Sequence, residues 1–236
     1  MSLPKIAHPT FELVVPSTLA KIKLRPMLVK EEKILLMAKA GDDKDDMLSA
    51  IRQVVNNCLI DEKVDIDKLT LFDIEFMFLK IRATSVSNIA KIVVTDAEDK
   101  KQYPFDIDLN KVEVKFPPDI EKNIKMTKDT GILMKFPEAS LYSDKEFWKS
   151  SGDELMAQFI LRCVDKYFTG DEMYDFAILS PEEKLEFVDN LDIPTYEKMR
   201  AFLGNIPSLY YKITYTNSLK NEREIILDAL PDFFIF

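Results

Sequence analysis

The stretch TLFDIEFMFLKIRATSVSNIAKIVV, from Thr70 to Val94, decides the fold class because the spacing of its apolar residues changes within it. Thr70 followed by Asp73 is typical of a helix N-cap. Apolar residues then recur every three or four positions as far as Ile81, which is the period of a helix. From Ile89 onward β-branched residues dominate, which favours a strand. A helix followed at once by a strand predicts an α+β chain.

The regions on either side extend this pattern. Residues 1–28 contain four prolines, which predict an extended N-terminal arm because proline fixes φ and pushes its predecessor toward extended conformations. The alternation of Phe11, Leu13 and Val15 with their neighbours leaves a short edge strand as the alternative. Residues 29–88 have helical spacing, residues 89–142 predict a small β-rich region, and residues 143–236 predict helices that close with a β-hairpin and an aromatic C-terminus. The predicted fold is therefore α+β, with a mostly helical body, a small antiparallel β block in the middle and a C-terminal β-hairpin.

Polar residues mark where the later helices begin. Ser143–Glu146 and Ser180–Glu183 both match the capping box, in which Ser is the N-cap and Glu follows three residues later. The second box also has Pro181 at the first helical position, where proline is favoured. Thr195 is expected to cap a further helix. Apolar residues from Trp148 to Tyr167 predict that the helix opened by the first box continues to Tyr167. The alternative is that Gly152, which lies inside this pattern, splits it into two segments.

The composition excludes several classes of protein. A net charge of −9 and a pI near 4.9 disfavour direct binding to nucleic acid, which depends on basic patches. No apolar run approaches the roughly 18 residues that a membrane span needs. Cys58 and Cys163 have no motif spacing, which indicates buried thiols in a reducing compartment rather than a disulfide scaffold or a cysteine-built zinc site.

The charge is unevenly distributed along the chain. Residues 1–40 carry seven Lys or Arg against three Glu, a net charge of +4, so the other 196 residues total −13. One interpretation is that a basic segment reaches an acidic neighbour, so that identical subunits associate head to tail. The other is that the lysines only solubilise a proline-rich start.

The sequence contains none of the usual catalytic motifs. The only histidine is His8, and there is no phosphate-binding loop, dinucleotide motif, nucleophile elbow or H-E-x-x-H. The acidic cluster Asp42–Asp46 is interpreted as the negatively charged start of a helix, since the spacing of a calcium loop is missing. We therefore expect no catalytic residues, no cofactor and no metal.

Two groups of residues are candidates for a protein interface. Phe233, Phe234 and Phe236 concentrate apolar surface in a short segment, and either contact a partner or fold back onto the hairpin as core. Arg82 and Ser85 follow the most apolar helix, and Arg82 pairs with an acid either within the fold or across an interface.

Several segments resemble the baseplate hub proteins of contractile-tailed bacteriophages of the T-even type. The aromatic helix from Phe72 to Val86 ends in Arg-x-x-Ser-Val, as in that family, and the segment Phe202–Leu209, the hairpin and the Phe233-Phe234 pair are also similar. Together these segments cover about a third of the chain. Some relatives carry a Cys-x-x-Cys in the hairpin turn, whereas residues Thr216–Asn221 contain no thiol, so a metal role does not transfer.

The resemblance implies a structural subunit or an assembly factor of the central hub of a tail baseplate. It implies assembly in the host cytoplasm, a place in the virion tail, and partners among the other baseplate or hub proteins, with association of identical subunits left open. Two alternatives remain: an acidic binding protein that acts as a DNA mimic or chaperone, and a carboxylate-dependent hydrolase with two facing acids.

Overall fold

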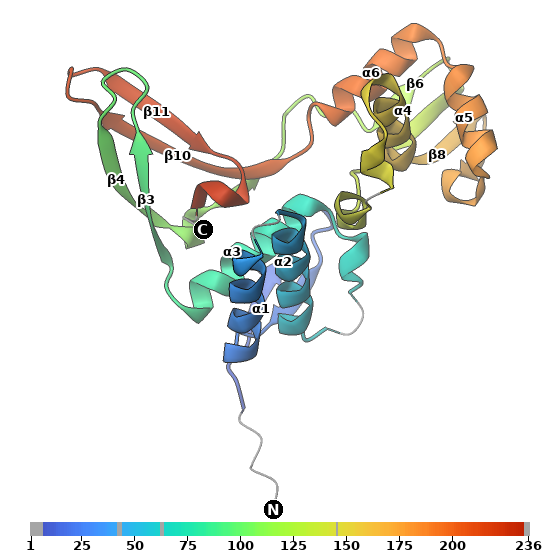
Figure 1. Cartoon of the computed structure of the whole chain (residues 1–236). Helices are drawn as coiled ribbons and strands as arrows, with labels where there is room; N and C mark the ends of the chain where they lie inside the picture. Colours follow the sequence, from blue (N-terminus) through green and yellow to red (C-terminus); the bar gives the residue numbers. More distant parts are fainter. Residues whose placement is uncertain (1–6, 42–43, 62–63, 145, 234–236) are drawn as a thin grey trace, which may run out of the picture. The chain divides into compact units, whose positions relative to one another are not determined.

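The computed structural model describes residues 7–41, 44–61, 64–144 and 146–233. Over these residues the chain forms six α-helices and eleven strands, and the strands form four small sheets (Figure 1). The chain divides into two compact units. The first joins residues 1–115 to residues 208–236, and the second comprises residues 116–207.

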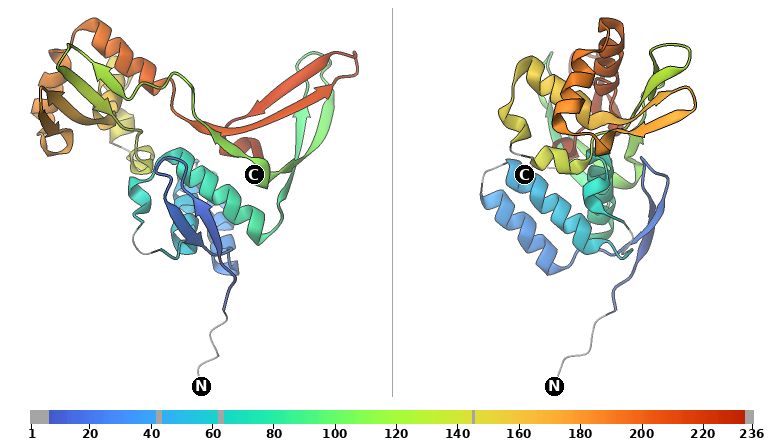
Figure 2. Two further views of the ribbon diagram at one scale, coloured as in Figure 1. Left: turned by 180° about the vertical axis from the view of Figure 1, so that it is seen from behind. Right: turned by 90° about the vertical axis from the view of Figure 1, so that its right-hand side faces the viewer.

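The first unit contains helices α1 (Val29–Ala40), α2 (Lys44–Cys58) and α3 (Leu71–Ser85). The hairpin formed by β1 (Phe11–Val14) and β2 (Lys21–Leu24) lies beside these helices (Figure 2). Helix α3 supplies the centre of the core through its buried apolar side chains, which are Phe72, Ile74, Met77, Phe78, Leu79 and Ile81.

The start of α3 confirms the predicted cap and also holds the first hairpin. The Thr70 hydroxyl accepts the N–H of Asp73 at 3.2 Å, and the Asp73 carboxylate accepts the N–H of Thr70 at 3.1 Å. The same carboxylate accepts the N–H of Ser17 at 2.9 Å. The turn between β1 and β2 is therefore fixed to the first turn of α3.

Two further hairpins form the β part of the first unit. β3 (Ile89–Thr95) pairs antiparallel with β4 (Gln102–Asp108). β10 (Ser208–Thr216) pairs antiparallel with β11 (Glu222–Leu227) on one side and with β5 (Glu113–Lys115) on the other. Both hairpins run in the same direction in Figures 1 and 2, and the ring of Tyr215 lies 4.9 Å from that of Tyr103 and 5.3 Å from that of Phe105.

Polar side chains join the turns of these two hairpins. The Asp96 carboxylate accepts the hydroxyl of Tyr215 and, at 3.1 Å, the Nε–H of Arg223. The Tyr215 hydrogen bond is the main reason why the pKa of Asp96 falls to about 2. Ser218 donates its backbone N–H at 3.0 Å and its hydroxyl at 2.8 Å to Asp99. These two carboxylates therefore join the β3–β4 hairpin to the β10–β11 hairpin.

The second unit is a four-stranded antiparallel sheet with three helices. The strand order is β6 (Asn123–Lys125), β7 (Thr130–Met134), β8 (Val164–Thr169) and β9 (Glu172–Asp175). The helices are α4 (Gly152–Cys163), α5 (Pro181–Asp189) and α6 (Ile193–Leu203). The described part of the chain also contains short 3₁₀ helices at Ile66–Lys68, Leu109–Lys111, Ala139–Ser143, Phe147–Lys149, Phe176–Ile178 and Leu230–Phe233.

The predicted mostly helical body is wrong. The structure is 42% helical and 28% strand, and its strands are spread over four sheets instead of one block and a separate hairpin. The proline-rich start forms the β1–β2 hairpin, and residues 164–175 form β8 and β9. The C-terminal hairpin is joined to the middle of the chain, because β10 pairs with β5. Long-range pairing of this kind leaves no local signal in the sequence.

A continuous helix from Ser143 to Tyr167 is wrong at both ends, whereas the alternative break at Gly152 agrees with the start of α4. Ser143 lies inside a 3₁₀ helix, and α4 begins at Gly152. The helix ends at Cys163 because the following residues form β8, which pairs with a strand on each side. Pairing on both edges outweighs the helical spacing of the apolar residues.

The outcomes for the other two predicted caps differ. The Ser180 hydroxyl accepts the N–H of Glu183 at 3.2 Å, and the Glu183 carboxylate accepts the N–H of Ser180 at 2.7 Å, which confirms the capping box of α5. Thr195 does not cap α6. The cap is Asp192, whose carboxylate accepts the N–H of Thr195 at 2.8 Å.

The two cysteines are free and buried, as predicted. Burial raises the pKa of the Cys58 thiol to about 11 and that of the Cys163 thiol to about 12. Both are therefore protonated, unreactive core residues at neutral pH. Among the described residues, no helix combines the length and the hydropathy needed to cross a lipid bilayer.

Candidate functional site

Helix α1 is held in place by a buried ion pair. Glu31 is the one buried residue of α1, all of whose residues the structure describes. Arg25 Nη2 donates to Glu31 Oε1 at 2.9 Å, and the Leu28 N–H donates to Glu31 Oε2 at 2.8 Å. Burial alone would raise the pKa of Glu31. The hydrogen bonds from Arg25 and Leu28 have a larger, opposite effect, so the pKa lies below its ordinary value. The carboxylate is thus ionised and fixed, and it anchors α1 through polar contacts.

The rest of α1 presents large apolar side chains to solvent. Val29 is 67% exposed, Leu36 is 59% exposed and Met37 is 75% exposed. Ile34 and Leu35 are half-buried against the unit. An amphipathic surface helix normally has a polar outer face, so apolar residues on both faces indicate a surface that contacts another protein.

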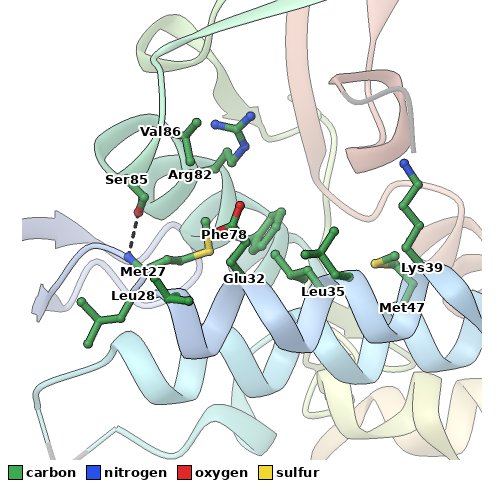
Figure 3. A pocket seen from close by; sticks show the side chains of 12 residues that line it. Met27, Leu28, Glu32, Leu35, Lys39, Met47, Phe78, Arg82, Ser85 and Val86 are labelled. Atoms are coloured by element: carbon green, nitrogen blue, oxygen red, sulfur yellow. Dashed lines mark hydrogen bonds between the residues drawn. The ribbon is translucent and has the colours of Figure 1, made fainter.

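A groove of about 420 Å³ adjoins this helix and is bounded by the C-terminal end of α3 (Figure 3). Ser85 fixes the shape of this wall, because its hydroxyl accepts the N–H of Met27 at 2.8 Å and donates to the carbonyl of Ile81 at 2.5 Å. The groove is lined mostly by apolar residues, with a few charged ones: Met27, Leu28, Val29, Glu32, Leu35, Leu36, Lys39, Met47, Phe78, Arg82, Ser85 and Val86.

The structure brings together two of the five predicted interface residues. Arg82 and Ser85 line the same groove. Phe233 is only 1% exposed, so its side chain is part of the core of the first unit. Phe234 and Phe236 lie outside the described residues. A role of these five residues in an interface stays a prediction.

Sequence reasoning predicted helix over residues 29–88, which includes α1, but it did not single out the exposed apolar face of α1 as a candidate interface. A signal was present, since KILLMA at residues 33–38 places four large apolar side chains in succession. A run of that kind cannot turn all its apolar groups toward a single partner face of a helix. The buried Glu31 left no signal, because a charged residue near a helix N-terminus is usually exposed.

The groove can accept apolar side chains from another protein and, at its edge, charged groups. Its charged members Glu32, Lys39 and Arg82 are of both signs. Among the residues that the structure describes, no three His, Cys, Asp or Glu side chains are gathered so that they could hold a metal ion. The capping role predicted for Asp42–Asp46 falls on residues or side chains outside the described set. The geometry therefore favours a contact surface for protein side chains.

Comparison with known proteins gives one match. A search of curated proteins and a search of solved structures found nothing similar to the chain. The family model described as T4 bacteriophage base plate protein matches residues 8–235, which is almost the whole chain. This match confirms the resemblance to T4-like baseplate proteins. The chain belongs to the T4 bacteriophage base plate protein family.

Proposed function

We propose that this protein is a structural subunit or an assembly factor of the central hub of a contractile tail baseplate, and that it acts by protein contacts without catalysis. Membership of the baseplate family supports a structural place in a phage tail in contact with other baseplate proteins. The exposed apolar face of α1 is the observation that carries the proposed mode of action. In this proposal the subunits meet in the host cytoplasm and the chain joins the tail there.

Burying a Val, Leu or Met side chain contributes about 1.5–3 kcal/mol relative to leaving it in water. Val29, Leu36 and Met37 are together on one helix, so covering them with a neighbouring protein would contribute several kcal/mol to assembly. The buried Arg25–Glu31 pair keeps α1 in one position, which reduces the entropy lost on binding.

The first experiment measures copy number. Mass spectrometry of purified phage particles, with peptides of this chain quantified against a known baseplate subunit, distinguishes the two roles. A fixed stoichiometric copy number supports a subunit, whereas its absence from finished particles supports an assembly factor. If assembly proceeds normally without the gene product, the proposal is wrong.

The second experiment tests α1. Leu36→Asp should leave the melting temperature nearly unchanged, because exposed substitutions usually alter stability by less than about 0.5 kcal/mol. It should nevertheless reduce assembly of baseplates. The matched control is Val93→Asp, which changes an exposed apolar residue of β3 and should assemble normally. Normal assembly of the Leu36→Asp variant would exclude α1 as the contact surface.

A further inference from the structure

The second unit carries an acidic surface that also exposes large apolar side chains. Residues 171–192 contain eight Asp or Glu and a single Lys, a net charge of −7 within 22 residues. In the same segment Ile178 is 80% exposed and Leu185 is 49% exposed. All four residues of the edge strand β9 are exposed as well. Most of the net charge of the chain is therefore concentrated beside unpartnered apolar groups.

Helix α5 shows how this surface is organised. Glu182, Leu185, Glu186 and Asp189 are all exposed and follow one another at spacings of three, one and three residues, so they lie on one face of the helix. The opposite face is fixed to the unit, because the ring of Phe187 lies 5.1 Å from that of Phe176 and 5.6 Å from that of Tyr167. The outer face of α5 is therefore a leucine surrounded by three carboxylates.

The outer face of α1 is its chemical complement. Val29, Lys33 and Leu36 are exposed at positions i, i+4 and i+7 of one face, with the exposed lysines Lys30 and Lys39 and one exposed acid, Glu32, beside them. Across residues 21–39 the chain has six Lys or Arg and two Glu. This face offers apolar groups interspersed with positive charge, where α5 offers a leucine interspersed with negative charge.

We infer that the α1 face of one copy binds the α5 face of a second copy. This inference rests on the proposal that α1 is a contact surface of a baseplate subunit, and it names the occupant. Apolar contact would provide the affinity, and the opposite charges would fix partner and orientation. Each chain carries both faces, so any second copy of the protein supplies the α5 face that the α1 face needs.

The charges also determine the symmetry of the contact. A two-fold α1–α1 contact would place lysines against lysines, and a two-fold α5–α5 contact would place carboxylates against carboxylates. The α1–α5 pairing is the one that brings together faces of opposite net charge, and this pairing joins two different surfaces. Contacts between different surfaces propagate head to tail and close into a ring or continue as a filament.

The test uses the purified full chain in sedimentation velocity over a range of concentrations. At low salt we expect species larger than a dimer that grow with concentration. At about 1 M salt we expect weaker association, because the Debye length falls to about 3 Å and the charge pairs lose most of their contribution. Lys33→Glu or Glu186→Lys alone should weaken self-association at least about tenfold. The controls Lys91→Glu and Glu121→Lys change exposed charges on β3 and before β6 and should associate like the wild type.

Mixing the two variants gives the decisive result. In the mixture the substituted α1 face of the Lys33→Glu chain can meet the substituted α5 face of the Glu186→Lys chain, and the other two faces are wild type. Both kinds of contact between the two chains then keep opposite charges at these two positions. An equimolar mixture should therefore associate more strongly than either variant alone. Failure of the mixture to recover association, or a wild type that is monomeric at low salt at every concentration, would overturn the inference. The proposed function is judged separately, by whether Leu36→Asp protein is excluded from baseplates.

Discussion

Arg25 and Glu31 form an ion pair in which the carboxylate is fully buried and Arg25 Nη2 lies 2.9 Å from Glu31 Oε1. The same guanidinium donates to the carbonyl of Asn57 at 2.6 Å, at the end of α2. One arginine thus joins the segment after β2 to both α1 and α2. The pair therefore anchors the proposed contact helix, none of whose apolar side chains is fully buried.

The first prediction concerns this pair. Arg25→Met would leave Glu31 buried without its cation, which typically costs about 3–5 kcal/mol of unfolding free energy. The control is Lys30→Met, because Lys30 Nζ is 3.5 Å from Glu31 and its side chain is 66% exposed, so its loss should cost less than about 1 kcal/mol. Urea unfolding at pH 7 measures both variants. Equal stability of the two variants would show that the buried pair does not anchor α1.

The second prediction concerns Glu75 on α3. The pKa of its carboxyl is raised to about 7, mainly by burial. A hydrogen bond from the backbone of Leu230 lowers this pKa, and the charges of Asp232 and Asp228 raise it. Since the unfolded pKa is about 4.5, the unfolded chain releases this proton first as the pH rises. Stability from this site should therefore fall between pH 4.5 and 7 and remain low above pH 7.

The Glu75→Gln variant tests this assignment. Between pH 5 and pH 8 the unfolding free energy of the wild type should fall by roughly 1–3 kcal/mol more than that of the Glu75→Gln variant. Asp228→Asn removes one of the neighbouring charges and should reduce the effect only in part. Identical pH profiles for wild type and Glu75→Gln would contradict the raised pKa.

The third prediction concerns Gly131 on β7. A Cβ there would lie 2.5 Å from the Phe168 ring and 2.7 Å from the backbone carbonyl oxygen of Ile124, and a backbone atom cannot move aside cheaply. Gly131→Ala should therefore destabilise the protein by about 1–3 kcal/mol or more. Gly204→Ala is the control, because its nearest contact would be an ordinary 3.5 Å. A thermal melt of each should show a loss only for Gly131→Ala; a neutral result there would mean that β6 and β8 do not approach β7 so closely.

Local sequence signals predicted the elements that depend on neighbouring residues. The caps at Thr70 and Ser180 and the strand from Ile89 formed as expected, because a side chain three residues away or a run of β-branched residues is sufficient to specify them. The predictions that were wrong concern elements whose structure depends on pairing with distant strands. β8 was predicted as helix because its two partner strands are not visible in its own spacing.

The candidate site was predicted only in part, for a related reason. Arg82 and Ser85 were found through their place at the end of an apolar helix. The exposed face of α1 could not be found in this way, since burial of Glu31 depends on Arg25 reaching it from outside the helix. The solvent face of a helix is therefore known only after its long-range polar contacts are known.

The last prediction separates core from interface in the aromatic segment. Phe233 is buried in the first unit, where Leu230 on the same 3₁₀ helix is also buried. Phe233→Ala should cost about 3–5 kcal/mol of unfolding free energy, as large-to-small changes in a core do. A chain ending at Phe233 keeps this side chain, so we expect it to melt like the wild type.

That shortened chain is the sharper test of the interface predicted for Phe234 and Phe236. If these residues contact a neighbouring baseplate protein, the shortened chain should fold normally and fail to enter baseplates. Circular dichroism melting and mass spectrometry of particles measure the two properties separately. Normal assembly would show that no contact depends on residues 234–236. A large fall in melting temperature would instead place these residues with Phe233 in the core, because a pure interface contributes nothing to the stability of the free chain.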